Sequence, residues 1–479
     1  MLMKTASSSL TEQLANRFAE RIGTRLLAGG ARLPSVRQCA QQQGVSASTV
    51  VAAYDRLLAL GLVEARKNRG FYVRETTAAQ QIHAPLATKN IAIESQLTYV
   101  PLHNPTHATA LIRGMFHGIS SKPQPGMGVF PPDWLATNFL PAAVRRFTGA
   151  KALNGLSLHY GEPAGDSTLR RALSQKLASI NVHAAPSQIM TTVGATHALD
   201  IVSRTLLSAG DCVMVEEPGW AIEFARLNAL GMRILPVPRT AAGPDLAVMA
   251  RYCELHQPKL FVSVSVLHNP TGYCLTPGSA HRVLQLASQH HFYIVEDDTY
   301  SHLAPEHATR LAALDGLQRT IYVSGFAKIL VPGWRVGYLA APPDLFERLL
   351  DTKLLASLTT PALLEKALAW CIDQGQLRRH AERLRSQLAV ARTRSVKLAL
   401  THGCTFAAEP AGLFGWVDTG TDTEFLAHRM LDEGYLLAPG MLFHAARQPS
   451  TLMRINFATT QDAAFWKVFA RLQNAAVKK

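Results

Sequence analysis

Short apolar runs rich in β-branched residues alternate with amphipathic stretches over most of this chain, and this alternation constrains the fold most strongly. The apolar runs lie at residues 189–193, 212–215, 260–266, 293–295 and 321–323. Between them lie helical patterns such as residues 195–207 and 279–290. Strands that are apolar along their whole length and joined by helices are typical of a parallel sheet covered on both faces. We therefore expect an α/β fold with a mostly parallel central sheet.

The chain separates into three regions by pattern. Residues 1–75 predict short helices followed by a strand pair, and residues 116–479 carry the strand and helix alternation. Residues 76–115 have no sustained periodicity and contain three prolines, so we interpret them as a linker. The sequence thus predicts a small N-terminal domain, a linker and a large α/β domain.

Composition excludes several classes of protein. Apolar residues make up 48% of the chain, which is enough for a packed core and argues against intrinsic disorder. No apolar stretch reaches the roughly 18 residues of a membrane span. The first residues contain no apolar signal core, so we expect a cytoplasmic protein. The six cysteines are scattered without a CxxC pair, so we expect neither a metal site nor a disulfide framework.

The N-terminal region has the pattern of a helix-turn-helix with a wing. The first helix is predicted by an apolar stripe of Leu10, Leu14, Phe18 and Ile22. A second helix is expected from Pro34–Ser35 to Gly44, and Ser46 can cap a third. The inner face of the third helix is predicted to consist of Val50, Val51, Tyr54, Leu57 and Leu58. The following segment, LVEARKNRGFYV, predicts two strands with a turn at Asn68–Gly70.

Charge favours double-stranded DNA as the partner of this region. Residues 1–75 contain 11 Lys and Arg against 5 Asp and Glu, a net +6 of the chain's +14. Cations that approach phosphates release counterions, which provides affinity for DNA of any sequence. Ala47, Ser48 and Thr49, at the start of the third helix, are small enough to reach base edges in the major groove. The alternative is a solvated three-helix domain that binds a protein partner.

Residues 32–73 resemble the winged-helix domain of GntR-type bacterial transcription regulators. The matching landmarks are LPSxR, VSxxTV and the closing RGFYV. One departure is Cys39 before Ala40, where the family often has Leu before Ala, and this affects core packing only. The resemblance implies that DNA is contacted by Arg37, Ser46, Ser48, Thr49, Arg66, Lys67 and Arg69.

The polar residues that follow the apolar runs are the candidate site, because ligands of open α/β sheets bind beyond the carboxyl ends of the strands. In chain order they include Gly194, Ala195, Thr196, Trp220, Asn269, Asp297, Tyr300, Ser324, Lys328 and Arg335. Together they offer a phosphate seat at a helix start, an aromatic plate, an amide, a carboxylate, a phenol, a lysine and an arginine. This set fits pyridoxal 5′-phosphate, whose aldehyde a lysine amine can hold as a Schiff base. Taken singly, Lys328 could be a solvated lysine, Trp220 a core residue and Asp297 a helix cap.

In order and spacing, residues 116–479 resemble the aminotransferases of fold type I. Further landmarks are YGEPAG at residues 160–165, PGMLF at 439–443 and RINF at 454–457. The resemblance implies that Lys328, Asp297 and Tyr300 are the catalytic residues, with Asp297 on the pyridine nitrogen. It further implies cofactor contacts from Asn269, Tyr300, Trp220, Gly194, Ala195, Thr196, Arg335 and Tyr160. Arg454 corresponds to the arginine that holds a substrate α-carboxylate.

One position departs from that family. Many relatives have a serine or threonine three residues before the lysine, where it touches the phosphate. Here Gly325 occupies the position and Ser324 precedes it. We expect either a lower affinity for phosphate or a contact from Ser324 through a shifted loop.

The fusion of the two regions resembles the MocR-type regulators. That resemblance implies a homodimer that binds DNA and pyridoxal 5′-phosphate and senses an amino compound or the cofactor itself. Two alternatives remain open. The chain could be an active aminotransferase that carries a DNA-binding domain, or a DNA-binding protein whose large domain is only a dimerisation scaffold.

Overall fold

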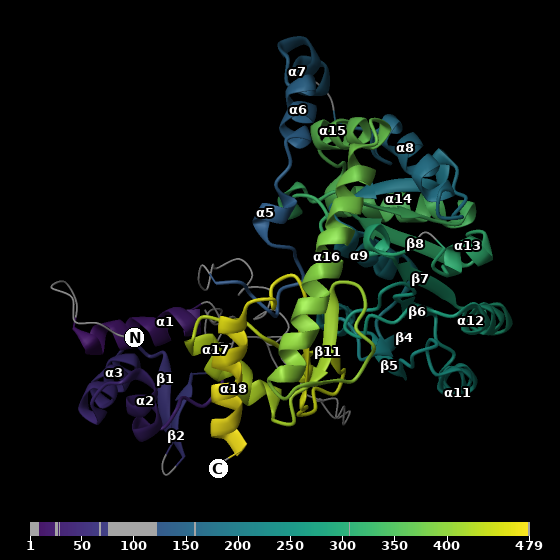
Figure 1. Ribbon diagram of the computed structural model, residues 1–479. Coiled ribbons are helices and arrows are strands. Elements are labelled where there is room, and N and C mark those ends of the chain that lie inside the picture. The colour runs from purple at the N-terminus through teal and green to yellow at the C-terminus, as the bar shows by residue number, and fades with distance from the viewer. Residues whose placement is uncertain are drawn as a thin grey trace, which may run out of the picture. The chain divides into compact units, whose positions relative to one another are not determined.

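The computed structural model describes residues 9–23, 27, 29–66, 69–74, 122–157, 160–305 and 307–477. The chain divides into two compact units, Met1–Ile119 and Ser120–Lys479. Both are drawn in Figure 1, and each is considered by itself. The linker expected at residues 76–115 and the wing residue Lys67 lie outside the described residues.

The small unit has the expected helix-turn-helix and wing. Its elements are α1 (Leu10–Gly23), α2 (Val36–Gln43), α3 (Ala47–Ala59), β1 (Val63–Arg66) and β2 (Gly70–Val73). The side chain of Ser35 caps α2 by accepting a hydrogen bond from the backbone amide of Gln38. Gly44 ends α2 with a left-handed φ of 64°, a conformation that is costly for residues with a Cβ. The tight turn to α3 therefore depends on glycine at this position.

A core of its own stabilises the small unit. Tyr54 lies at its centre, edge-on to the rings of Phe18 at 5.6 Å and Phe71 at 5.0 Å. Its hydroxyl donates to the Pro34 carbonyl at 2.8 Å, which ties α3 to the start of α2. Val51 was expected on the inner face, but the prediction is wrong, since its side chain is 43% exposed. It lies about 100° around the helix from Val50, which is buried.

A seven-stranded sheet forms the centre of the large unit (Figure 1). Its order is β3-β9-β8-β7-β6-β4-β5, and β9 is the one strand of this sheet that runs opposite to the other six. The strands are β3 (Ile189–Thr192), β4 (Cys212–Glu217), β5 (Arg233–Pro238), β6 (Leu260–Ser263), β7 (Tyr293–Asp297), β8 (Thr320–Gly325) and β9 (Gly337–Ala340). The expected mostly parallel α/β sheet is confirmed.

Helices cover both faces of this sheet, as the alternation of side chains requires. In β4, Val213 and Val215 pack on one face against α9 (Ala195–Leu206) and α14 (Pro343–Ser357). Cys212 and Met214 pack on the other face against α11 (Leu246–His256) and α12 (Pro277–His290). The remaining helices are α5 (Pro132–Leu135), α6 (Phe139–Phe147), α7 (Ala150–Ser157), α8 (Ser167–Ala178), α10 (Ala221–Ala229), α13 (Leu311–Asp315), α15 (Ala362–Asp373), α16 (Gln376–Thr401), α17 (Thr423–Asp432) and α18 (Ala463–Val477).

A second, antiparallel sheet was not predicted. It has the order β10-β11-β13-β12, with strands β10 (Thr405–Phe406), β11 (Phe414–Asp418), β12 (Ala438–Pro439) and β13 (Leu452–Asn456). Two of these strands have only two residues, which is too short for an alternation to be recognised in a sequence.

The apolar run at residues 260–266 forms a shorter strand than predicted, since β6 ends at Ser263. The next residue, Val264, donates its backbone amide to the Glu216 side chain at 2.9 Å.

None of the helices in the described parts of the chain is long and apolar enough to cross a membrane.

Candidate functional site

Trp220 and Asp297 line the same pocket at the carboxyl ends of β4, β6 and β7. The full lining consists of Leu199, Val215, Glu216, Gly219, Trp220, Glu223, Val262, Val264, His268 and Asp297. Valines and a leucine form its apolar walls, the indole forms one flat side, and acidic groups and an imidazole supply polar atoms. Such a pocket fits a flat heteroaromatic ring that carries one polar atom toward Asp297.

The Asp297 carboxylate is positioned by the turn that follows β7. Its Oδ1 accepts hydrogen bonds from the amide of Thr299 at 3.0 Å and from the Thr299 hydroxyl. Removal from water raises the pKa of Asp297 to about 6, although the two bonds from Thr299 lower it. An ionised Asp297 is therefore better stabilised when a positive partner lies opposite, as a protonated ring nitrogen would.

Lys328 follows β8 and places its amine beside the residues that precede α5. Nζ donates to the Gly128 carbonyl at 2.8 Å and lies 5.7 Å from the centre of the Tyr300 ring. Burial lowers the pKa of Lys328 to about 8, and the cation of Arg454 adds to this effect while Asp297 opposes it. With this pKa, about a tenth of the amine is neutral at pH 7 and about half at pH 8, and the neutral form is the one that attacks a carbonyl carbon.

Arg454, on β13, is buried, with 1% of its surface exposed. Nη1 donates to Asn269 Oδ1 at 3.0 Å and Nη2 donates to the Gly126 carbonyl at 2.6 Å. The guanidinium carbon lies 4.3 Å from the centre of the Phe414 ring and 5.4 Å from that of Trp220. Among the described residues, no acceptor lies within hydrogen-bond distance of the buried Nε. An orphaned N–H of this kind fits one oxygen of a carboxylate ligand.

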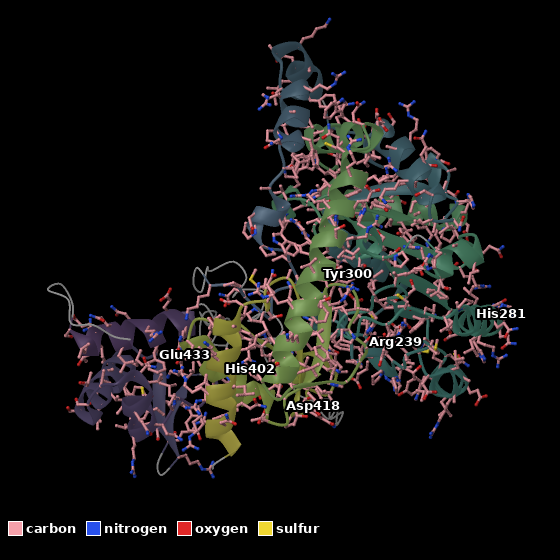
Figure 2. All side chains as sticks on the ribbon, in the orientation of Figure 1. Arg239, His281, Tyr300, His402, Asp418 and Glu433 are labelled. Carbon is pink, nitrogen blue, oxygen red and sulfur yellow. The ribbon has the colours of Figure 1, made fainter. Side chains whose placement is uncertain are left out.

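Tyr300 lies in the interior of the large unit (Figure 2). Burial raises the pKa of its phenol well above the usual range, so it stays protonated and can donate a hydrogen bond. Its ring is edge-on to Phe414 at 5.5 Å. Tyr300, Asn269 and Lys328 are not among the residues that line the pocket, but Tyr300 lies next to the Lys328 amine and Asn269 next to Arg454.

The start of α9 forms a cradle for an anion. A Cβ on Gly194 would lie 2.5 Å from Arg335 Nη2, and a Cβ on Gly337 would lie 2.7 Å from the Ala195 amide nitrogen. Only glycine allows these close approaches at both positions. The exposed Thr196 hydroxyl, the amides of the first helical turn and the Arg335 guanidinium all border it. Helix N-termini with converging N–H groups bind phosphate well.

Two residues expected to contact the cofactor, Ser324 and Tyr160, do not lie with the other candidate site residues. The Ser324 hydroxyl donates to the Asp298 carbonyl at 2.9 Å, inside a buried polar cluster. It cannot replace the missing hydroxyl of Gly325, because successive residues of β8 point to opposite faces of the sheet. Tyr160 is 85% exposed and contributes nothing to the site of its own chain.

Sequence reasoning missed the acidic wall of the pocket. Glu216 is buried, pairs with Arg239 and accepts hydrogen bonds from Ser263 and Val264. Arg239, labelled in Figure 2, is buried as well. Glu223 pairs with Arg226 one turn along α10. A charged residue within an apolar run, such as Glu216 at the end of β4, is the signal that could have found this wall.

The candidate DNA-binding residues lie on one end of α2, on α3 and on the wing. Arg37, Ser46, Ser48, Arg66 and Arg69 are all exposed. The Ser46 side chain caps α3 through the Thr49 amide at 3.1 Å, which leaves the first turn of α3 open to a ligand. Arg66 pairs with Glu64 at 2.8 Å and covers the Tyr72 ring. Exposed pairs of this kind are weak, so Arg66 can exchange its partner for a phosphate.

Two models of known protein families match separate parts of this chain. Residues 132–472 match the model of aminotransferase class I and II, and residues 10–73 match that of the bacterial regulatory proteins of the gntR family. The HTH-type transcriptional regulator YisV of Bacillus subtilis is 25% identical and covers 90% of this chain and 89% of its own length. The probable rhizopine catabolism regulatory protein MocR of Rhizobium meliloti is 29% identical, over 84% of this chain and 79% of its own.

Enzymes match the large unit as well. The 2-aminoadipate transaminase of Thermus thermophilus is 29% identical over 67% of this chain and 82% of its own length. The crystal structure of the α-aminoadipate aminotransferase LysN from the same organism superposes with a TM-score of 0.70 at 23% identity, over 77% of this chain and 95% of that one. The chain therefore belongs to the aminotransferase class I and II family, and it carries a helix-turn-helix of the gntR type before the aminotransferase-like domain.

Proposed function

We propose that this protein is a transcription regulator that binds double-stranded DNA through its N-terminal unit and pyridoxal 5′-phosphate through its aminotransferase-like unit. The observation that carries the proposal is the placement of the Lys328 amine beside Tyr300 and within electrostatic reach of Asp297, whose carboxylate lines a pocket together with the Trp220 indole. In the same chain, a basic helix-turn-helix offers a surface for DNA. We infer domains at residues 1–75 and 116–479 with a linker at 76–115, and a cytoplasmic location.

The residues present fit pyridoxal 5′-phosphate in shape and charge. The start of α9 suits the phosphate, with Ala195, Thr196 and the nearby Arg335 guanidinium as its contacts. Trp220 would cover one face of the ring, Asp297 would hold a proton on the ring nitrogen, and Asn269 with Tyr300 would hold the ring hydroxyl. When bound, the cofactor supplies an electron-withdrawing ring.

Each polar side chain then has one task. Lys328 supplies the amine that holds the aldehyde, and Tyr300 with Asn269 would hold the ring hydroxyl beside it. Arg454 binds a carboxylate through its Nε edge, so the sensed molecule is an amino compound with a carboxylate, or the cofactor alone. Binding can change DNA affinity only if the two arrangements of the protein differ in affinity for the ligand.

We further propose a homodimer. Leu355 is 92% exposed and Leu358 is 54% exposed on the large unit. The backbone at Gly161, next to the exposed Tyr160, lies beside Thr359 and Thr360, so these side chains form one surface. Pairing of two such surfaces would bury them and bring Tyr160 toward the other subunit. Two DNA-binding units in one particle also multiply a modest single-site affinity.

The first experiment maps the attachment of the cofactor. The full chain is mixed with pyridoxal 5′-phosphate, its visible absorbance is followed, the adduct is reduced with borohydride, and the modified peptide is identified. We expect the adduct on Lys328 and none in the Lys328→Ala variant. Lys353→Met is a matched control, because burial also lowers the pKa of Lys353 to about 8. An adduct on Lys353, or no adduct, would overturn the cofactor site.

The second experiment tests the link to DNA. Duplexes are selected from a random pool by the protein itself, and their affinity is measured with and without pyridoxal 5′-phosphate and a panel of amino acids. We expect at least one of these additions to change the affinity, and the change to vanish in Lys328→Ala. An unchanged affinity throughout would favour a dimerisation scaffold.

A working aminotransferase is the other function that the site favours, because Lys328, Asp297 and Arg454 are all present in suitable surroundings. Multiple turnovers with an amino acid and a keto acid acceptor would favour the enzyme over the regulator.

A further inference from the structure

Residues 124–130, which we call the strap, cross the candidate site immediately before α5. The backbone amide of Gly126 donates to the Leu436 carbonyl at 2.7 Å, and the backbone amide of Asn456 donates to the Pro125 carbonyl at 3.1 Å. A Cβ on Gly126 would lie 2.5 Å from the carbonyl carbon of Leu437. The strap backbone therefore lies directly on the chain that precedes β12 and on the end of β13.

One side chain holds two carbonyls of the strap. Asn456 Nδ2 donates to Met127 at 2.9 Å and to Val129 at 2.7 Å. The side chain of Asn456 is itself fixed, because its Oδ1 accepts the amide of Ala458 at 3.0 Å. Since Asn456 is fully buried, no water can replace these bonds easily. They are a permanent anchor of the strap.

Two further carbonyls of the strap, those of Gly126 and Gly128, accept hydrogen bonds from the residues that we assign to ligand binding. Arg454 Nη2 donates to Gly126 at 2.6 Å, and Lys328 Nζ donates to Gly128 at 2.8 Å. A Cβ on Gly128 would lie 3.3 Å from Nζ, so the strap backbone and the amine are in direct contact. Four consecutive carbonyls thus alternate between a permanent donor and donors that the proposed function assigns to ligands.

We propose that the strap reports occupancy of the site: without ligand its Gly126 and Gly128 carbonyls occupy Arg454 and Lys328, and binding at either residue releases the carbonyl that this residue holds, while Asn456 keeps its hold. This inference rests on the proposed function and adds how the site is regulated. Asn456 acts as a positioning residue, because it sets the strap against the two ligand-binding side chains.

The chemistry of both donors supports release. When the Lys328 amine condenses with an aldehyde, one water leaves and the nitrogen loses protons that it could donate to Gly128. A carboxylate at Arg454 brings negative oxygens next to the Gly126 carbonyl, and both acceptors compete for one guanidinium. In sequence, the strap is the first described part of the large unit after the segment that leads from the DNA-binding unit.

Hydrogen exchange measures the strap directly. The cofactor-free full chain is compared with the chain saturated with pyridoxal 5′-phosphate, and deuterium uptake is followed in the peptide that spans the strap. We expect uptake about five-fold faster with pyridoxal 5′-phosphate, the factor that one net hydrogen bond contributes to an opening equilibrium. In Lys328→Ala the uptake should be fast from the outset and unresponsive. Lys353→Met, which removes a donor to Pro163 instead, should respond like the natural chain.

The outcomes separate the strap from the cofactor site. An adduct on Lys328 with unchanged strap exchange would overturn the strap and leave the cofactor site intact. No adduct would overturn both. If Lys328→Ala does not fold, the comparison of the natural chain with and without pyridoxal 5′-phosphate decides alone.

Asn456→Ala tests the positioning role. We expect the adduct on Lys328 to form as before, while the ratio of DNA affinities with and without pyridoxal 5′-phosphate falls to about one. A merely structural residue would lower stability without changing that ratio, so an unchanged ratio would refute the role of Asn456.

Discussion

A hydroxyl at position 325 should tighten the binding of phosphate. Gly325 ends β8, and a Cβ built on it would lie 3.6 Å from the Ala195 amide nitrogen, at the mouth of the anion cradle. Its nearest neighbours would be Gly337 Cα and the Val336 carbonyl, both at 3.4 Å, an ordinary van der Waals distance. Gly325→Ser therefore fits without displacing the backbone and directs a donor into the cradle.

The expected gain follows from one hydrogen bond to a charged group. Such a bond contributes about 1.5–3 kcal/mol, which corresponds to roughly 10- to 150-fold tighter binding. The assay is a titration of the cofactor-free chain with pyridoxal 5′-phosphate, followed by absorbance, and a parallel competition with inorganic phosphate. Phosphate competition reports the cradle separately from Lys328.

Gly325→Ala is the matched control, since it adds the same Cβ without the hydroxyl. We expect its affinity to stay within about two-fold of the natural chain, because any change it causes comes from packing alone. If Gly325→Ser binds no more tightly than Gly325→Ala, the assignment of this space to a phosphate is refuted.

Three further predictions concern the lysine, the turn and the DNA surface. The rate of adduct formation should rise with pH and level off above about 8, because only the neutral Lys328 amine attacks and its pKa is lowered to about 8; a rate that still rises steeply at higher pH in a stopped-flow series would contradict this. Gly44→Ala should destabilise the DNA-binding unit by about 1–2 kcal/mol in thermal unfolding, owing to the left-handed φ of 64°, whereas Gly23→Ala, which has open space and no such φ, should not. Arg37→Ala should reduce the slope of log affinity against log salt by about 1 if this exposed side chain contacts a phosphate, and an unchanged slope would remove it from the interface.

Much of the fold could be predicted because its signals are local. The strands β3, β4, β6, β7 and β8 are short apolar runs followed by polar residues, so they could be recognised along the chain without any contact being known. The other two strands of the sheet were not predicted: β5 contains an arginine and two prolines, and β9 has only four residues. Asp297 and Lys328 could be identified in the same way, as polar groups at the carboxyl ends of neighbouring strands. Capping by Ser35 and the left-handed turn at Gly44 depend only on the residues beside them.

Other features depend on contacts between residues far apart in the chain. The direction in which Ser324 points was decided by the pleat of β8 and the Asp298 carbonyl beside it, which a list of site residues does not contain. The acidic wall at Glu216 exists because Arg239, which directly follows β5, compensates its charge.

The strap shows the division between sequence and tertiary structure most clearly. By itself, the sequence determined which residues have suitable chemistry, because an amine, a guanidinium or a carboxylate keeps its properties wherever it lies in the chain. Only the tertiary structure decided that Arg454 meets the Gly126 carbonyl, 328 positions earlier in the chain, and that Lys328 meets that of Gly128. A backbone carbonyl has no identity in the sequence, so its partners are set by how the sheets and loops pack.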